Sequence, residues 1–400
     1  MELVTDTIQR YRQLYSEDPE VVVIAPGRVN LIGEHTDYNN GYVLPVAIDR
    51  NIIIAAGPRA DEMLCLHSVD YQESVRIPLS KNIADERQFW SNYPRGVAHV
   101  LHNAGLRIKG VNMCIRGNIP IAAGLSSSGA LEVASAIAFN FLYTLKLPAI
   151  ELIKYSQKAE TEYVRVLCGI MDQYVSVMGK KDHVLFLDCR SLDSEYVQFP
   201  EGVQLIICDT GVRRELAHSE YNQRREECNE AVRQLAKFKE GIQSLRDISL
   251  DEFQEYEPHI SPVQRRRAKH VISENDRVLR GVDALKRNDM KEFGRHMFDS
   301  HRSLKDLYEV SSNELDVVVD IASESDGVYG ARMTGAGFGG SAICLVAEEK
   351  IDELVQRLRI EYPKRVGRSL TIYLSSPENG ATVQFPRLSD ASILFTELLQ

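Results

Sequence analysis

Glycine is concentrated at one place in this chain. Six of its 25 glycines fall within residues 327–340, which read Gly-Val-Tyr-Gly-Ala-Arg-Met-Thr-Gly-Ala-Gly-Phe-Gly-Gly. Such a segment lets the backbone approach a ligand or another part of the molecule closely. The glycines at 335, 337 and 340 have the spacing of a dinucleotide-binding loop, which needs a strand before it and a helix after it. Here the next segment, 341–346, predicts a strand, so the dinucleotide interpretation fails.

A second segment of small residues predicts a phosphate cradle. Residues 120–130 read Pro-Ile-Ala-Ala-Gly-Leu-Ser-Ser-Ser-Gly-Ala and precede a helical pattern over 131–145. Backbone N–H groups at a helix N-terminus attract anions, and serine hydroxyls can bind phosphate oxygens or Mg²⁺. Gly124 and Gly129 have the P-loop spacing, but Ala130 and Leu131 stand where Lys-Ser/Thr is needed. We therefore exclude a P-loop NTPase. The alternative to a cradle is a serine N-cap with a tight helix contact.

The third segment, residues 25–41, follows a strand pattern over 21–24 and is dense in polar groups. Glu34, His35 and Asp37 offer hydrogen-bond acceptors and donors, and Arg28 offers a cation. Carboxylates and an imidazole in one loop suit a polyhydroxyl ligand. Two alternatives remain, an exposed turn and a Glu-His-Asp metal site, although no paired-ligand spacing supports the metal.

Two acidic residues complete the set of candidates. Asp172 lies between apolar neighbours just after Gly169, and Glu160 lies in the helix predicted after Pro148. Beside two phosphate-type loops, they are candidates for a catalytic base and a Mg²⁺ ligand.

Charge and composition limit the partners. The 400-residue chain has a net charge of −10, which argues against nucleic acid, whose phosphates favour a basic face. It contains no apolar run approaching 18 residues and no secretory signal pattern, so we expect neither a membrane span nor export. Its seven cysteines form no C-x-x-C pair, which is typical of free thiols in a reducing cytoplasm.

The order of the predicted elements indicates an α+β fold. Strand patterns at 21–24, 52–55, 184–187 and 203–208 alternate irregularly with helical patterns at 215–239, 263–287 and 313–324. The polar segment 188–202 is the candidate boundary, which divides the chain into domains 1–200 and 201–400.

These segments together resemble one family. Residues 27–41 resemble the sugar signature of galactokinases, and 119–130 and 330–340 resemble two further motifs of the GHMP kinase superfamily. The resemblance continues over nearly the whole chain in the expected order, through the segments 169–173, 188–192, 219–225 and 266–277. It implies a two-domain GHMP kinase fold with the active site in the cleft between the halves. It also implies the reaction ATP + α-D-galactose → ADP + α-D-galactose 1-phosphate, in a cytoplasmic monomer.

The resemblance also implies roles for single residues. Asp172 matches the proposed catalytic base, and Arg28 matches the residue that stabilises the transition state. The nucleotide would be ATP, with Mg²⁺ held by Ser128 and Glu160. The sugar-binding positions are Glu34, His35, Thr36, Asp37, Gly169, Asp172 and Tyr221, and the nucleotide-binding positions are Ser68, Ala122, Ala123, Gly124, Leu125, Ser126, Ser127 and Ser128.

Some residues depart from the family pattern. Ala122 and Ala123 precede Gly124 where the family often has glycine, Gly129 replaces the usual alanine, and Gly211 stands where asparagine is common.

Two alternative functions remain. One is a sugar sensor without catalysis, although such sensors lack residues after the serine run and residues 128–132 keep the enzyme-like length. The other is a 1-kinase for a different sugar, such as N-acetylgalactosamine or arabinose.

Overall fold

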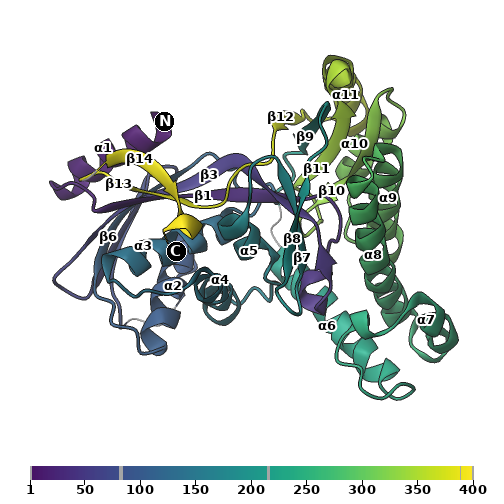
Figure 1. Ribbon diagram of the computed structural model, residues 1–400, viewed down its shortest axis with the longest axis horizontal. Helices are drawn as coiled ribbons and strands as arrows, with labels where there is room; N and C mark the ends of the chain where they lie inside the picture. The colour runs from purple at the N-terminus through teal and green to yellow at the C-terminus, as the bar shows by residue number, and fades with distance from the viewer. Residues whose placement is uncertain (1, 81–83, 214–216, 388, 399–400) are drawn as a thin grey trace.

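The computed structural model describes residues 2–80, 84–213, 217–387 and 389–398. Its N-terminal half is built on a seven-stranded sheet in the order β14-β13-β1-β3-β6-β4-β5. Figure 1 shows β14, β13, β1, β3 and β6 of this sheet. Only the β4–β6 pair is parallel among the described strands of this sheet. Its strands are β1 (Val21–Asn30), β3 (Pro45–Pro58), β4 (Met63–Ser68), β5 (Glu73–Pro78), β6 (Val111–Gly117), β13 (Thr382–Phe385) and β14 (Ser389–Leu394).

Helices cover both faces of this sheet, which explains why β1 begins with a continuous apolar run. Val21 and Val23 face the core beneath α3, whereas Val22 faces Tyr11 of α1 on the other side. Successive side chains of a strand point to opposite faces, so a strand buried on both faces needs apolar residues at every position. The helices of this half are α1 (Glu2–Tyr15), α2 (Asn92–Asn103), α3 (Ser127–Leu142), α4 (Ala149–Lys158) and α5 (Met171–Met178).

The C-terminal half is built on a second, antiparallel sheet in the order β10-β11-β9-β12. One face, with Ile207 and Ile343, packs into the core of the first half, and the other, with Ile206 and Cys344, packs beneath helices. The two halves therefore share an apolar contact. The elements are β9 (Val203–Asp209), β10 (Val328–Thr334), β11 (Ser341–Ala347), β12 (Thr371–Ser375), α6 (Ala217–Leu235), α7 (Leu250–Tyr256), α8 (Pro262–Lys286), α9 (Met290–Ser303), α10 (Asn313–Ser323) and α11 (Ile351–Val366).

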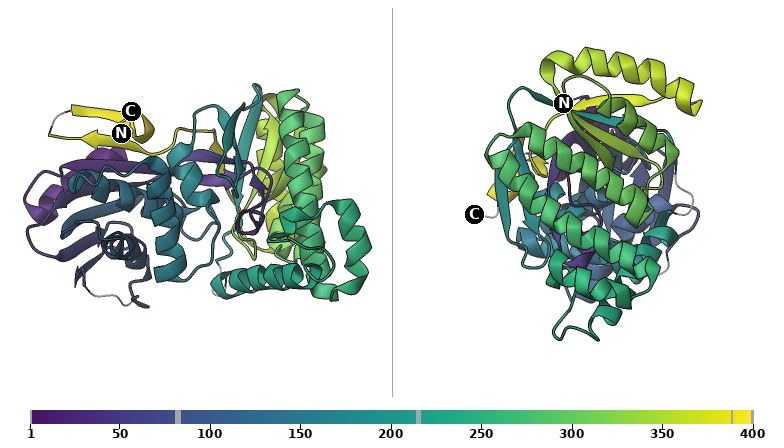
Figure 2. Two further views of the ribbon diagram at one scale, coloured as in Figure 1. Left: turned by 60° about the horizontal axis from the view of Figure 1, so that its bottom comes forward. Right: turned by 90° about the vertical axis from the view of Figure 1, so that its right-hand side faces the viewer.

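The chain returns to the first sheet at its end. After β12, strand β13 pairs with β1 through Val23↔Val383, so segments far apart in sequence lie side by side (Figure 2). A small third sheet connects the halves and contains β2 (Tyr42–Val43), β7 (His183–Asp188) and β8 (Ser194–Gln198). The predicted boundary at 188–202 leads directly into β9, whereas β13 and β14 complete the sheet of the first half.

The structure confirms the predicted α+β class and the strand and helix patterns. All four predicted strands lie within β1, β3, β7 and β9, and the segment 341–346 lies in β11. The predicted helices correspond to α6, α8 and α10, except that part of 215–239 lies outside the described residues. The seven cysteines carry free thiols, as expected. No described helix has the length and apolar character needed to cross a bilayer.

Candidate active site

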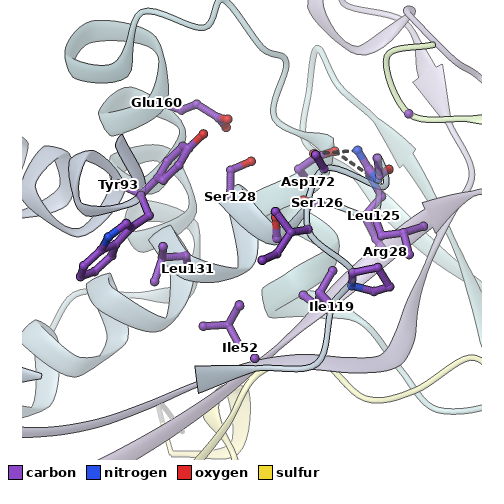
Figure 3. A pocket seen from close by; sticks show the side chains of 18 of the residues that line it. Arg28, Ile52, Tyr93, Ile119, Leu125, Ser126, Ser128, Leu131, Glu160 and Asp172 are labelled. Atoms are coloured by element: carbon purple, nitrogen blue, oxygen red, sulfur yellow. Dashed lines mark hydrogen bonds and ion pairs between the residues drawn. The ribbon is translucent and has the colours of Figure 1, made fainter. Parts of the chain in front are cut away.

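A cavity of about 770 Å³ lies where the two halves meet. The three glycine-containing segments of the sequence converge on it, because residues 28–37, 117–128 and 335–336 all contribute to its walls. Figure 3 shows Arg28 and Asp172 at one side of this cavity and Ser128, Glu160 and Tyr93 at the other. The sequence motifs therefore form one site, although they are separated by up to three hundred residues.

Arg28 and Asp172 form a largely buried ion pair at this side of the cavity. Arg28 follows an irregularity in the pairing of β1, and Asp172 lies in the first turn of α5. The guanidinium donates to both carboxylate oxygens, from Nε to Oδ1 at 2.8 Å and from Nη2 to Oδ2 at 2.7 Å (Figure 3). Burial alone would lower the pKa of Arg28, but the carboxylates of Asp172 and Glu34 raise it. The pair therefore keeps Arg28 charged, and one guanidinium binds both oxygens of the Asp172 carboxyl group.

Arg28 also bonds the backbone of the loop at residues 120–128. Its Nη1 donates to the Gly124 carbonyl at 2.8 Å, and its backbone N–H donates to the Leu125 carbonyl at 3.1 Å. Arg28 therefore holds the phosphate loop, defined here as residues 120–128, against the end of β1, the strand that leads into the sugar loop, defined as residues 30–42.

Glu34 in the sugar loop is held by three donors. Oε1 accepts from the Gly335 N–H at 2.7 Å, and Oε2 accepts from Arg332 Nη1 at 2.7 Å and from Asn30 Nδ2 at 3.0 Å. Burial raises the pKa of Glu34, and Arg332 and Arg28 oppose that increase. These contacts fix the direction of a carboxylate at the cavity wall.

His35 is buried beside Glu34 with a φ angle of +63°, which is unusual for a residue with a side chain. Its Nδ1 lies 2.8 Å from the Tyr38 hydroxyl, and its ring centroid lies 5.5 Å from that of Tyr221 on α6. Nε2 has no hydrogen-bond partner among the described residues. Burial lowers the pKa of His35 well below its usual value, so the ring is neutral. The ring therefore has one nitrogen free for a ligand hydroxyl.

Asp37 lies against Gly169 and close to Asp172. A Cβ at residue 169 would overlap the Asp37 carboxylate, so only glycine fits there. Burial, and then the charge of Asp172, raise the pKa of Asp37 to about 7. One end of the cavity is thus lined by three carboxyl groups, one imidazole and one phenol. They belong to Glu34, Asp37, Asp172, His35 and Tyr221.

The phosphate loop has an unusual backbone. Ala122 and Ser126 both have left-handed φ angles, +57° and +61°, which glycine adopts without strain and other residues do not. α3 begins at Ser127, and Ser126 Oγ has no hydrogen-bond partner among the described residues. The loop thus presents serine hydroxyls and a helix N-terminus to the cavity, which is a favourable place for an anion. The interpretation as a cradle fits this geometry better than a simple N-cap.

Glu160 lies close to the serine end of this loop. It belongs to the π-helical turn Ala159–Val164 that follows α4, and it is buried. Its Oε2 accepts from Gln173 Nε2 at 2.8 Å and from the Cys168 thiol at 3.2 Å, and Ser128 is hydrogen-bonded to it. Burial, and then Asp172, raise the pKa of Glu160.

This hydroxyl–carboxylate pair has the oxygen donors that Mg²⁺ prefers. Within the described residues, no group of three or more His, Cys, Asp or Glu side chains is arranged to hold a metal. A Mg²⁺ ion between Ser128 and Glu160 would therefore take most of its ligands from phosphate oxygens and water.

The far end of the cavity is aromatic, and the sequence motifs did not reveal it. The rings of Tyr71 and Trp90 are nearly parallel, with an interplanar angle of 8° and centroids 6.3 Å apart. Trp90 Nε1 donates to Glu73 at 2.8 Å, and Ser68 and Tyr93 also line this end. Flat apolar surfaces suit a planar base. In the sequence, the residue that could have drawn attention to this end of the cavity is Trp90, the one tryptophan of the chain.

Three of the predicted site residues lie behind the cavity wall. The Thr36 hydroxyl donates within the sugar loop, to the carbonyls of Gly33 and Tyr42. The Ala123 carbonyl accepts from Ser341 Oγ at 2.8 Å, and Gly169 packs on Asp37. These residues shape the loops, whereas the other predicted residues line the cavity.

Known proteins share these sequence and structural features. Residues 9–58 match the model of the galactokinase galactose-binding signature, residues 92–180 the GHMP kinase N-terminal domain, and residues 282–364 the GHMP kinase C-terminal model. A galactokinase of Roseiflexus sp. is 44% identical over 93% of this chain and 95% of its own length. A galactokinase of Clostridium beijerinckii is 40% identical over 92% of this chain and 96% of its own.

Solved structures agree with these relatives. The crystal structure of Lactococcus lactis galactokinase complexed with galactose has a TM-score of 0.91 and 35% identity, over 95% of this chain and 99% of that one. A mevalonate kinase, 21% identical with a TM-score of 0.61, shares the fold. The match in sequence, in domain models and in structure leads to one conclusion: the chain belongs to the galactokinase family of the GHMP kinases.

Proposed function

We propose that this protein transfers the γ-phosphoryl group of ATP to the C1 hydroxyl of α-D-galactose, which gives ADP and α-D-galactose 1-phosphate. The observation that carries the proposal is the Arg28–Asp172 pair, which lies where the sugar loop meets the phosphate loop. An acceptor hydroxyl and a γ-phosphate bound in these two loops would meet at this pair.

Asp172 acts as the base in the proposed reaction. Its carboxylate takes the proton of the anomeric hydroxyl while that oxygen forms a bond to the γ-phosphorus and the bond to ADP breaks. Arg28, paired with this carboxylate, offsets negative charge as the oxygen attacks. Phosphoryl transfer needs positioning and charge neutralisation above all, so one base and one cation are sufficient from this side.

The sugar is held by the polar end of the cavity. The Glu34 and Asp37 carboxyl groups, the free Nε2 of His35 and the Tyr221 hydroxyl offer directed partners for ring hydroxyls. Several hydrogen bonds of fixed direction can distinguish one hydroxyl arrangement from another, since a wrong epimer leaves buried polar groups unpaired. The L. lactis structure, which contains galactose, supports galactose as the sugar.

The nucleotide occupies the rest of the cavity in this proposal. The triphosphate lies on residues 122–128, and the base lies at the aromatic end near Ser68 and Trp90. Mg²⁺ at Ser128 and Glu160 supplies, when bound, positive charge beside the transferring group. Glu160→Gln should raise the Mg²⁺ concentration for half-maximal rate by roughly tenfold, because a charged ligand becomes neutral. An unchanged Mg²⁺ titration would remove Glu160 from the metal site.

The decisive experiment measures ADP release with ATP and Mg²⁺ against galactose, N-acetylgalactosamine, glucose, arabinose and a blank without sugar. Turnover confined to galactose and close analogues at C2 supports the proposal. Turnover with N-acetylgalactosamine alone would assign a different 1-kinase. Binding of galactose without turnover would support the sensor hypothesis instead. The monomeric state and the cytoplasmic location stay predictions, which light scattering and cell fractionation would test.

A further inference from the structure

The residues that hold Glu34 come mainly from the other half of the chain. Glu34 follows β1 of the first sheet, yet its backbone and side chain are bonded to α8 and β10. The preceding Gly33 N–H donates to Glu274 Oε1 at 2.9 Å. The Glu34 carbonyl lies 3.1 Å from His270 Nε2. Arg332 Nη1 donates to the carboxylate at 2.7 Å. Two of these three residues belong to the segment 266–277, to which the proposed reaction gave no role.

The bond to Glu274 acts on a flexible point of the loop. Gly33 has a φ angle of +98°, and a Cβ there would press on the Tyr42 carbonyl, so the turn needs glycine. Glycine allows many backbone conformations, and a hydrogen bond to its N–H selects one of them. Glu274 itself is fixed, because Oε1 also accepts from Ser300 Oγ at 2.6 Å and Oε2 accepts from Arg277 Nε at 2.7 Å.

Glu274 is an ionised acceptor. Burial opposes its charge, but the Arg277 and Arg332 guanidinium groups help to lower the pKa of Glu274 to about 2. A charged acceptor gives a stronger hydrogen bond than a neutral one. The Gly33 N–H is therefore held firmly.

His270 is a neutral donor with one possible tautomer. Burial lowers its pKa to about 4. Because a carbonyl oxygen only accepts, Nε2 carries the proton to Glu34, and Nδ1 accepts from Ser303 Oγ at 2.8 Å. The ring also lies 4.5 Å from that of Tyr308, which lies 4.7 Å from His35. His270 of α8 thus supports Glu34 directly and His35 through the ring of Tyr308.

We propose that His270, Glu274 and Arg332 are positioning residues of the sugar site, through which the C-terminal half sets the affinity for the sugar without touching it. The proposal rests on the proposed function, because it takes the sugar loop as the place where galactose binds. A carboxylate displaced by a fraction of an ångström loses its hydrogen bond to a ring hydroxyl. The phosphate loop has separate supports, Arg28 and Ser341, so the nucleotide should be affected little.

The test compares two substitutions at one residue. His270→Phe keeps a ring against Tyr308 and removes the donor to Glu34. It should raise the KM and the Kd for galactose by about tenfold or more, with little change in the KM for ATP. His270→Gln places an amide nitrogen near the position of Nε2 and should restore most of the affinity. A residue with a merely structural role would not show this split between the two substrates or this rescue.

A matched control separates positioning from stability. His296 on α9 is also buried, and no described contact joins it to the sugar loop. His296→Phe should leave the galactose KM unchanged even where it lowers the melting temperature. Equal increases of both KM values in folded His270→Phe, or no increase at all, would overturn the proposal.

A milder variant covers the case in which His270→Phe does not fold. Ser303→Ala removes only the hydroxyl that fixes the His270 ring, and it should raise the galactose KM by about two- to threefold. An unchanged galactose KM in this variant would contradict the proposal. Failure of the wild-type protein to bind or phosphorylate galactose is a different result, because it would refute the proposed function itself.

Discussion

The sugar loop and the phosphate loop meet at Arg28, but they are held in different ways. In the sugar loop, hydrogen bonds from both halves fix the backbone and the side chains, as at Glu34 with its three donors. In the phosphate loop, Arg28 and Ser341 hold carbonyl groups from behind, while Ser126 Oγ has no partner within the described residues. Each loop therefore keeps a buried polar atom that a ligand would satisfy, His35 Nε2 or Ser126 Oγ, but only the sugar loop has its carboxylate fixed by donors before a ligand arrives.

This difference teaches how specificity can be divided within one site. A sugar is distinguished by the direction of each hydroxyl, which demands fixed partners. A triphosphate is bound by charge and by backbone N–H groups, which tolerate small shifts. Each variant below alters one loop or the point where they meet.

The largest effect is expected at the meeting point. Asp172→Asn keeps a hydrogen-bonding group beside Arg28 and removes the base, so kcat should fall by roughly 10²- to 10⁴-fold. Galactose binding, measured by calorimetry, should persist because the sugar loop is unchanged. Turnover near that of the wild type would show that Arg28 alone acidifies the hydroxyl.

Gly169→Ala tests the rigidity of the sugar end. The added methyl group would overlap the Asp37 carboxylate, and a fixed loop cannot move aside. The KM for galactose should rise by roughly 10²-fold while the KM for ATP changes little. Gly281→Ala in α8 is the control, since its Cβ would meet Phe293 at 3.2 Å and would reach the sugar loop only at Ile32, in ordinary contact at 3.7 Å. A small effect at residue 169 would mean that the sugar loop is adaptable, contrary to the comparison.

Asp37→Asn measures what the crowded carboxylates cost in stability. The pKa of Asp37 is raised to about 7, so the folded state favours the protonated form. The ordinary pKa of an aspartate, which we take for the unfolded state, is 3.8. Between pH 3.8 and pH 7 the unfolded state has therefore lost this proton while the folded state keeps it, so the free energy of unfolding falls as the pH rises. The variant should therefore be more stable than the wild type at pH 8.5 by about 4 kcal/mol, with a smaller difference at pH 4.5. A difference independent of pH, in thermal melts, would contradict this account.

The smallest effect concerns strain in the phosphate loop. Ala122 has a left-handed φ angle, so Ala122→Gly should raise the free energy of unfolding by about 0.5–1 kcal/mol. Ala123 is not among the residues with positive φ angles, and Ala123→Gly should instead lower it by about 0.5–1 kcal/mol. Urea unfolding of both variants gives the comparison. If both variants lowered the free energy of unfolding, the backbone at residue 122 would be unstrained.

The sequence predicted the local elements and the loops well. The strand at 341–346 is an apolar run of β-branched and small residues, and it lies in β11, so the rejection of a dinucleotide fold is confirmed. The motifs at 25–41, 120–130 and 327–340 converge on one cavity, as the resemblance implied. Short-range patterns and motif spacing carry this information directly.

Contacts between distant segments could not be predicted in the same way. Nothing near Gly33 signals that Glu274 accepts its N–H, because the partners are 241 residues apart. The parallel rings of Tyr71 and Trp90 likewise depend on how the segment before α2 packs against β4 and β5. Such pairs have no periodicity or local composition to detect, and only the folded chain brings them together.

The return of the chain to its first sheet has a consequence for synthesis. β1 pairs with β3 on one side and with β13 on the other, and β13 begins at Thr382 of 400 residues. On the ribosome, one edge of β1 therefore stays without its native neighbour until about 350 further residues have been made. An open strand edge is a template for pairing with other chains. A chain truncated shortly before residue 382 would keep this edge open permanently, and we expect it to aggregate rather than to give a smaller working protein.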